Sequence, residues 1–465
     1  MRWSGPPVGI ARVEAALATA VLARPDAVLA VFDREAAGFR LLNPTWQHAL
    51  IGWSAHMEEQ DDDPARRGWR AWVPSRKPVV ARLERWRLTW PAPFAALADA
   101  AQRALLGMRS HSTPVFDGAG QRVARLAPDL ALADVLPLGA GDVLFSAGSG
   151  WSHGDAAALA RMKARDGFGY AMLCYDLIPI THPRYWFPEA VRRVRAHWIA
   201  NVPLADLVVV NARCIAEDLG RFAADNGLAT PETARLPLGY DPPPAEVTAP
   251  LPEGVAAGRY ALFVSTIEPR KGHMTLLRAW RALLARGIPQ RHDFRLVFVG
   301  RVGWMVEEVL EALAEDDWQG SLLHLQGIGG PTLDALYAGA AFCLYPSTYE
   351  GFGLPIIEAF ARGKAVLAST GGAVPETVGG LSPCLPPDDP AAWEAALEVW
   401  IVDPAARRPW EARIAEGFAY PDWPTAAAAI LDAVAGLSPM RPATAAATDG
   451  AASGAANPAG AEPPR

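Results

Sequence analysis

Several features that mark other classes of protein are missing from this chain of 465 residues. No apolar run approaches the roughly 18 residues that a membrane-spanning helix needs. The opening residues, MRWSGPPVGIARVEAAL, lack the pattern of a secretory signal peptide. No internal repeat stands out. The four cysteines have no metal-ligand spacing, which favours a reducing compartment over a disulfide framework. The sequence therefore predicts a cytoplasmic protein.

The chain also has fewer basic than acidic residues, 43 against 50. The formal net charge is -7 at pH 7, which argues against a nucleic-acid-binding protein. Only four of the 43 basic residues are lysines, so a lysine inside a motif is informative here. No apolar run is followed by a full GxGxxG fingerprint with an acidic residue about 20 positions later, which argues against a dinucleotide-dependent oxidoreductase.

The length and the pattern of the chain predict two α/β domains. A chain of 465 residues that is 51% hydrophobic can bury two separate cores. Short apolar runs alternate with helical stretches, which predicts parallel sheets covered on both faces, with ligands beyond the carboxyl ends of the strands. The predicted parts are residues 1–240, a Pro-rich linker at 241–258, a second domain at 259–420, a final helix at 421–437 and a disordered tail at 438–465.

The segment YPSTYEGFGLPIIEA, at residues 345–359, is the most informative part of the chain. An apolar run ends at Tyr345, Gly351 and Gly353 open the backbone, and Pro355 suits the first turn of a helix. Such a turn presents free amide groups at a helix N-terminus. Those groups can bind a phosphate or a sugar hydroxyl.

Two acidic residues, Glu350 and Glu358, flank this loop. Paired catalytic carboxylates of a glycoside hydrolase lie roughly 5 to 9.5 Å apart, whereas eight helical steps would separate these two by about 12 Å. The spacing therefore favours acids that bind two different parts of one long ligand. The alternative is a solvated loop acid followed by an acid on a helix face.

A second motif, YALFVSTIEPRKGH at residues 260–273, carries two adjacent cations, Arg270 and Lys271, just beyond an apolar strand. Arginine can bind a diphosphate in bidentate fashion, and lysine acts as a compact point charge. A solvated basic turn is the alternative. The segments at 296–304, 322–337 and 365–380 repeat the pattern of a strand followed by a glycine loop, with Gly303 in the first of them.

The N-terminal half has a comparable motif, YDLIPITHP at residues 175–183, after an apolar run. Asp176 follows the predicted strand directly, and a helix or turn cap is the structural alternative for an aspartate in this place. Tryptophans and arginines interleave between residues 46 and 90. That combination suits contact with a membrane surface or a lipid-linked acceptor, or else packing at the core and its rim.

Together these motifs resemble the retaining family 4 glycosyltransferases, which have the two-domain GT-B fold with a C-terminal helix that crosses back to the N-terminal domain. The segment from Glu350 to Glu358 resembles the family's signature of two glutamates separated by seven residues. The resemblance implies that Glu350 contacts the donor sugar and that Glu358 holds the ribose hydroxyls. The amides of Gly351, Phe352, Gly353 and Leu354 would then lie near the sugar and phosphates.

The resemblance also gives roles to the second motif. Arg270 and Lys271 match the phosphate-binding segment, in which an arginine commonly stands five positions before the lysine. Thr266 occupies that position here, and Arg270 is expected to supply the missing charge, as in the TIEPRKGH variant of bacterial polysaccharide-building members. If Thr266 instead reflects a lost site, the enzyme hypothesis weakens. Gly303 is expected on the donor side.

On the acceptor side, YDLIPITHP resembles the family's acceptor-domain segment. Many relatives have histidine where this chain has Tyr175, so Asp176 is the expected contact or base for the acceptor hydroxyl, with His182 as a second candidate. The segment GPPVGIAR resembles the glycine loop beside the donor phosphates and includes Gly9. Relatives usually place a strand before that loop, which suggests either a lost strand or an upstream extension.

The resemblance implies a retaining hexosyltransferase that moves a mannose-like or glucose-like unit from a nucleotide diphosphate sugar to a glycan or lipid-linked acceptor in surface polysaccharide assembly, such as lipopolysaccharide. It implies no metal ion and no cofactor besides the donor. The expected location is cytoplasmic or peripheral at the inner face of the cell membrane. Two alternatives stay open: a sugar-nucleotide epimerase of the same fold, and a non-catalytic binding protein with this architecture.

Overall fold

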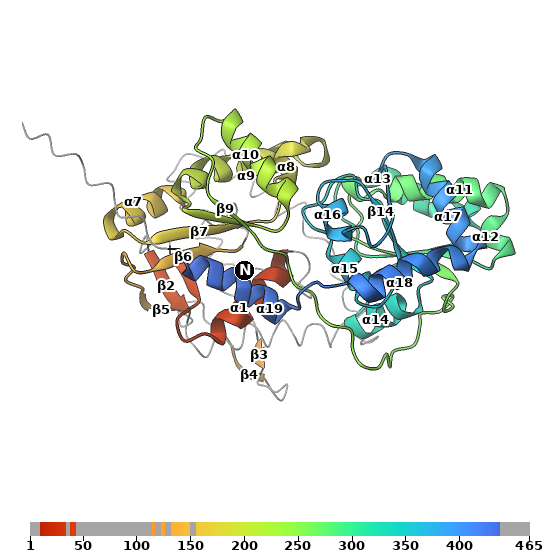
Figure 1. The fold of residues 1–465 in the computed structure, drawn as a ribbon, viewed down its shortest axis with the longest axis horizontal. Coiled ribbons are helices and arrows are strands. Elements are labelled where there is room, and N and C mark those ends of the chain that lie inside the picture. The colour runs from red at the N-terminus through yellow and green to blue at the C-terminus, as the bar shows by residue number, and fades with distance from the viewer. Residues whose placement is uncertain are drawn as a thin grey trace, which may run out of the picture.

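The computed structural model of the chain describes residues 10–33, 38–42, 114–116, 122–125, 132–148 and 155–437. These residues form two α/β domains that stand side by side (Figure 1). Gly9, the tryptophan-rich stretch at 46–90 and the tail at 438–465 lie outside the described residues.

The C-terminal domain is built on a six-stranded parallel sheet. Its strands are β10 (Tyr260–Val264), β11 (Arg295–Val299), β12 (Leu322–Leu325), β13 (Phe342–Tyr345), β14 (Val366–Ser369) and β15 (Cys384–Leu385). Their order across the sheet is β12-β11-β10-β13-β14-β15, so the direction of winding reverses between β10 and β13. Strand β10 is buried on both faces, as its continuous apolar sequence predicts.

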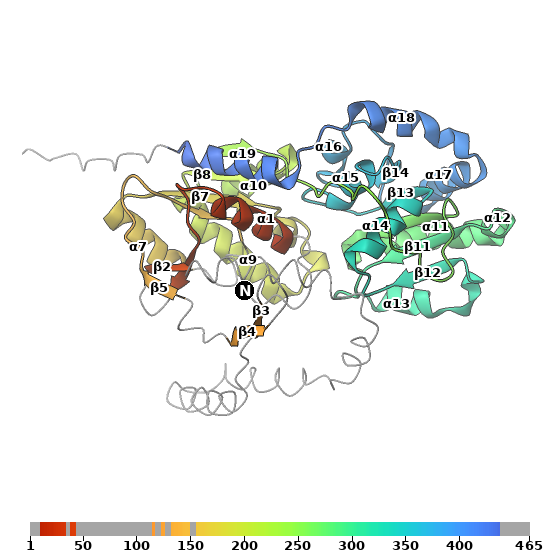
Figure 2. The same cartoon turned by 90° about the horizontal axis from the view of Figure 1, so that it is seen from below.

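Helices cover both faces of this sheet (Figures 1 and 2). They are α11 (His273–Ala285), α12 (Ile288–Arg291), α13 (Glu307–Ala314), α14 (Gly330–Gly339), α15 (Leu354–Phe360), α16 (Val374–Val378), α17 (Pro390–Val402) and α18 (Arg408–Gly417). In α11, Leu276, Trp280 and Leu284 recur at the four-residue spacing that places side chains on one helix face. All three are buried against the sheet.

The N-terminal domain contains a four-stranded parallel sheet in the order β6-β7-β8-β9. The strands are β6 (Val143–Ser146), β7 (Gly169–Cys174), β8 (Leu207–Val210) and β9 (Thr233–Arg235), and the helices between them are α7 (Ala156–Asp166), α8 (Ile178–Thr181), α9 (Pro188–Asn201) and α10 (Arg213–Asp225). Strands β7 and β8 are fully buried, which agrees with their uninterrupted apolar sequences.

The N-terminal domain also has antiparallel strands that the sequence analysis did not predict. Strand β2 (Gly38–Leu42) lies between β1 (Ala30–Asp33) and β5 (Leu132–Val135), and β3 (Pro114–Phe116) pairs with β4 (Arg122–Arg125). Only four residues connect β1 to β2. A connection that short permits an antiparallel pair, whereas a parallel pair needs a crossover of a dozen or more residues.

The chain ends its described part by returning to the N-terminal domain. Helix α19 (Trp423–Ala435) lies beside α1 (Ile10–Leu22), and both views show the two helices together on the N-terminal sheet (Figures 1 and 2). Val13 and Leu17 of α1 share one buried cluster with Ile430 and Val434 of α19. Two Rossmann-like domains joined by a returning helix confirm the predicted GT-B arrangement.

Candidate active site

The candidate site lies where the winding of the C-terminal sheet reverses. The loops that follow β10 and β13 leave neighbouring strands at this switch point, which is where sheets of this kind bind ligands. The backbone N–H of Thr348 donates to the carbonyl of Arg270 at 2.7 Å and ties the two loops together. A Cβ at Gly272 would lie 2.8 Å from the carbonyl carbon of Pro346, so the loops can approach this closely only because residue 272 is glycine.

Four charged side chains converge in these loops. Lys271 Nζ lies 2.6 Å from Glu350 Oε1, and Arg270 Nη1 lies 2.7 Å from Glu350 Oε2. Arg270 Nη2 also lies 3.2 Å from Glu268 Oε2. All four side chains are largely shielded from solvent. Glu350 therefore pairs with both cations that the sequence analysis assigned to phosphate binding.

The protonation of this cluster is set by burial and by the paired charges. Burial raises the pKa of Glu350, but the charges of Arg270 and Lys271 outweigh burial and hold that pKa at about 2. Burial, reinforced by Arg270, lowers the pKa of Lys271. Burial raises the pKa of Glu268. Glu350 is consequently ionised at neutral pH and acts only as a hydrogen-bond acceptor, not as a proton donor.

Asp176, from the N-terminal domain, lies close to this charged cluster. Its Oδ1 accepts a hydrogen bond of 3.0 Å from the backbone N–H of Ile178, so it caps the turn that leads into α8, which is the structural alternative. Burial raises the pKa of Asp176, and Arg270 opposes this rise. A Cβ at Gly351 would lie 2.9 Å from Asp176 Cβ, so a glycine is required where the two domains touch. Asp176 is thus a cap that also belongs to the electrostatic environment of the cations.

The other predicted acceptor-side residues are placed differently. The ring of Tyr175 is buried in a cluster that also contains Phe352, and its hydroxyl donates to the carbonyl of Ala147. Its backbone carbonyl lies beside Gly351 of the donor loop. His182 packs on the ring of Tyr349 with 4.3 Å between ring centroids. Burial lowers the pKa of His182. Tyr349 in turn donates to Asp218 Oδ2 at 2.5 Å, which joins the two domains beside the cluster.

Glu358 has a separate set of partners. Its Oε2 accepts a hydrogen bond of 2.8 Å from the hydroxyl of Tyr337, and its Oε1 lies 2.5 Å from Arg12 Nη1. Arg12 also pairs with Asp241. Arg12 was not among the predicted site residues, because 346 positions separate it from Glu358. The available signal was its place at the end of the predicted glycine loop GPPVGIAR.

The remaining donor-side candidates shape the backbone of the loops. Gly353 has a φ of 118° at the N-cap of α15, with Phe352 buried before it and Leu354 beginning the helix. A Cβ at Gly303 would lie 2.5 Å from the carbonyl oxygen of Ile267 and 3.2 Å from Thr266 Cγ2. These residues set how closely the strand loops pack at the switch point.

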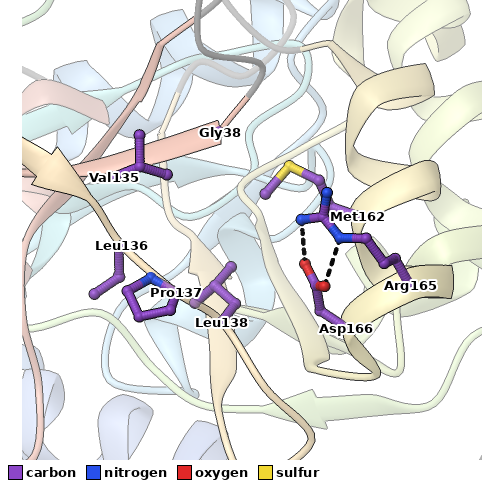
Figure 3. Close-up of a pocket in the computed structure, with 8 residues that line it drawn as sticks. All are labelled: Gly38, Val135, Leu136, Pro137, Leu138, Met162, Arg165 and Asp166. Carbon is purple, nitrogen blue, oxygen red and sulfur yellow. Dashed lines mark hydrogen bonds and ion pairs between the residues drawn. The ribbon is translucent and has the colours of Figure 1, made fainter.

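A cavity of about 390 Å³ lies away from this site (Figure 3). It is lined by the segment from Val135 to Leu138, by Gly38 and by the end of α7. Arg165 and Asp166 bind each other there in bidentate fashion, at 2.6 and 2.7 Å. No predicted site residue lines this cavity.

Within the described ranges, no three His, Cys, Asp or Glu side chains are grouped so that they could hold a metal ion. No helix in this part of the chain has the length and the apolar character needed to cross a membrane.

Part of the C-terminal domain is similar to known proteins. The family described as "Glycosyl transferases group 1" matches residues 258–403. The serotype-specific mannosyltransferase WbdA of Escherichia coli is 30% identical over 222 residues, which are 44% of this chain and 26% of that protein. O-antigen chain mannosyltransferase B of Escherichia coli is 35% identical over 138 residues, which are 30% of this chain and 35% of that protein.

The chain therefore spans between about a quarter and about a third of the length of these two relatives. Among solved structures, Anabaena HepE in complex with UDP and glucose aligns with a TM-score of 0.49 and 18% identity. That alignment covers 64% of this chain and 78% of HepE.

Proposed function

Because residues 258–403 form a glycosyl transferases group 1 domain, we propose that this protein is a glycosyltransferase whose donor, a nucleotide diphosphate sugar, binds at the switch point of the C-terminal sheet. The observation that carries the proposal is the convergence of Arg270, Lys271 and Glu350 there. Two buried cations beside one carboxylate suit a ligand that combines a diphosphate with a sugar.

The charged residues have separate roles during transfer. Arg270 and Lys271 neutralise the negative charge that develops on the diphosphate as the bond between it and the sugar breaks. Glu350, held ionised by both cations, accepts hydrogen bonds from donor-sugar hydroxyls and fixes the sugar. Glu358 accepts hydrogen bonds from the ribose hydroxyls. The amides from Gly351 to Leu354 contact the sugar and the phosphates.

The acceptor approaches from the N-terminal domain. Its hydroxyl oxygen forms the new bond to the anomeric carbon on the face that the diphosphate leaves, so the anomeric configuration is retained. Asp176 is the candidate that contacts this hydroxyl or takes its proton, and burial raises its pKa in the direction that a base needs. No metal ion takes part in this scheme, so transfer should proceed in the presence of a chelator.

The substrates are proposed from the relatives. Both relatives from Escherichia coli are named mannosyltransferases, and one is named for the O-antigen chain. We therefore favour a mannose-like hexose carried on guanosine or uridine diphosphate, and an acceptor that is a glycan or a lipid-linked sugar in surface polysaccharide assembly. A glucose-like donor is the nearest alternative.

The first experiment is a thermal-shift series with guanosine, uridine and thymidine diphosphates and their sugars, on the wild type and on Glu358→Ala. A ligand that binds only the folded state raises its apparent stability. We expect a shift with one base, and a much smaller shift in the variant because the ribose loses its acceptor. If no nucleotide raises the melting temperature of the wild type, the result favours the non-catalytic binding protein over the enzyme.

A transfer assay tests the phosphate role directly. Lys271→Ala is expected to lower transfer by orders of magnitude with an unchanged far-UV circular dichroism spectrum. Lys163→Ala is the matched control, because Lys163 pairs with Asp206 in the N-terminal domain. Wild-type turnover in Lys271→Ala would contradict the proposed role. Turnover of a nucleotide sugar without any acceptor would instead favour the epimerase.

A further inference from the structure

A second cavity, of about 420 Å³, lies between the two domains. Asn211 and Arg235, which line it, stand at the carboxyl ends of β8 and β9 in the N-terminal domain. Phe352 and Glu376 line it from the C-terminal domain, and Tyr420 lines it from the segment that returns to α19. Its volume falls within the range of about 300 to 1,000 Å³ that small-molecule sites occupy.

One buried polar group in this cavity has no protein partner. Asn211 is 6% exposed, and within the described part of the chain its Oδ1 accepts no hydrogen bond. A buried amide oxygen left without a donor is energetically unfavourable. A residue that lines a cavity and has an unused acceptor is therefore suited to a ligand that donates a hydrogen bond, such as a hydroxyl group.

The charges of the cavity offset each other. Glu376 accepts hydrogen bonds of 2.8 Å from the backbone N–H of Arg213 and 2.9 Å from that of Cys214, at the N-terminus of α10. The N-cap residue of α10, Ala212, has no side chain that does this. Arg235 Nη1 lies 3.7 Å from Glu376 Oε2. A carboxylate thus already occupies the place where an anion would bind, so the cavity favours a neutral ligand.

Aromatic groups form another wall. The rings of Phe352 and Tyr420 lie with centroids 6.0 Å apart, and the hydroxyl of Tyr420 donates to the carbonyl of Thr377 at 3.2 Å. Thr377 Oγ1 donates to the carbonyl of Phe352 at 2.7 Å, which fixes that part of the donor loop. Apolar surface with a few fixed polar groups suits a sugar ring, which combines C–H faces with hydroxyl groups.

From these contacts we infer that the cavity is a carbohydrate subsite that holds a non-reacting sugar unit of the acceptor, and this inference rests on the proposed glycosyltransferase function. Phe352 is two residues after Glu350, so their Cα atoms lie within about 7.6 Å of each other. Arg270 and Lys271 do not line the cavity, so it lies outside the diphosphate site. Because both domains contribute walls, the subsite is complete only in this relative placement of the domains.

Ligand-observed saturation-transfer NMR with methyl α-D-mannopyranoside and methyl α-D-glucopyranoside, on the full-length protein, tests the subsite. Ala419→Trp adds a large ring to the lining of the cavity at an exposed position, and Asn211→Leu removes the unpaired amide oxygen. Ala415→Trp is the matched control, because Ala415 is also exposed and does not line the cavity. We expect saturation transfer to at least one glycoside in the wild type and the control, and at least a fivefold weaker signal in the two cavity variants.

Two NMR results would overturn the inference: no saturation transfer to either glycoside in the wild type, or equal signals in the wild type and in a cavity variant that still folds. A nucleotide thermal shift on each variant shows that its C-terminal site is intact. In the transfer assay, Ala419→Trp should raise the acceptor KM at least fivefold with the donor KM unchanged. Transfer with an unchanged acceptor KM would refute the subsite and leave the proposed function standing, whereas glycoside binding without nucleotide binding would refute the function and, with it, the assignment of the bound sugar to an acceptor.

Discussion

Replacing Glu350 by glutamine would show how strongly the charge cluster stabilises the C-terminal domain. The carboxylate pairs with Arg270 and Lys271, and their charges hold its pKa at about 2, against an ordinary value of 4.5. At about 1.4 kcal/mol per pKa unit, this difference corresponds to about 3 kcal/mol. Glu350→Gln leaves two buried cations without that partner. We therefore expect its free energy of unfolding at pH 7 to fall by about 3 kcal/mol.

The stability difference between the wild type and Glu350→Gln should become smaller as the pH falls. A carboxylate whose pKa is lower in the folded state stabilises the fold fully above its unfolded pKa, here about 4.5, and loses that contribution as the pH falls toward 2. Between the wild type and Glu350→Gln, the difference in unfolding free energy should therefore shrink at pH 3.5 to about 60% of its value at pH 7. Glu350→Gln also removes one of the charges that raise the pKa values of Asp176 and Glu268, although burial is the main cause of both rises and is present in both proteins.

Urea unfolding at pH 7 and pH 3.5 would measure these differences, with tryptophan fluorescence reporting on the buried Trp280 and Trp393 of the C-terminal core. Glu398→Gln is the matched control, because Glu398 pairs with Arg286 on the surface and such pairs contribute about 0 to 1 kcal/mol. An unchanged urea midpoint in Glu350→Gln at pH 7 would refute the electrostatic argument. So would a difference of the same size at both pH values.

Three further substitutions test the stability of the charged groups and the contact between the domains. Lys271→Met should lower the free energy of unfolding, measured with urea, by less than about 1 kcal/mol, because burial disfavours the charged lysine and Arg270 still pairs with Glu350. A loss as large as that of Glu350→Gln would contradict this. Arg12→Ala should lower the unfolding free energy by about 1.5 to 3 kcal/mol, because Glu358 loses a charged partner; an unchanged melting temperature would argue against that pairing in solution. Gly351→Ala should push the domains apart, which X-ray scattering would detect as a larger radius of gyration, with nucleotide binding retained.

Contacts between the domains determine whether the candidate site is complete. Tyr349 binds Asp218, the indole N–H of Trp304 donates to the carbonyl of Tyr185 at 2.9 Å, and Glu376 caps α10. The first two contacts join loops beyond C-terminal strands to the N-terminal domain, and the third joins α16 to it. Opening the domains would uncover the donor loops and leave the N-terminus of α10 without its cap. The structure therefore links the enclosure of the site to specific hydrogen bonds across it.

Local sequence predicted the elements of the C-terminal domain well, for a physical reason. Strand β13 and helix α15 follow from an apolar run, two glycines and a proline within about 20 residues, and the structure places both elements there. The antiparallel strands β1, β2 and β5 were missed. Strand β5 pairs with a strand about 90 positions earlier in the chain, and its short apolar run has no periodicity that identifies such a partner.

The sequence by itself determined the residue types of the candidate site and the order of strands and loops that carry them. Arg270, Lys271 and Glu350 could be assigned to loops after strands because turn residues and apolar runs act locally. Only the tertiary structure decided which side chains meet. It paired Glu358 with Arg12, turned the ring of Tyr175 into the core and built a cavity from Asn211 and Glu376. Those contacts depend on how the two domains pack against each other. No local sequence pattern encodes a contact between residues that lie far apart in the chain.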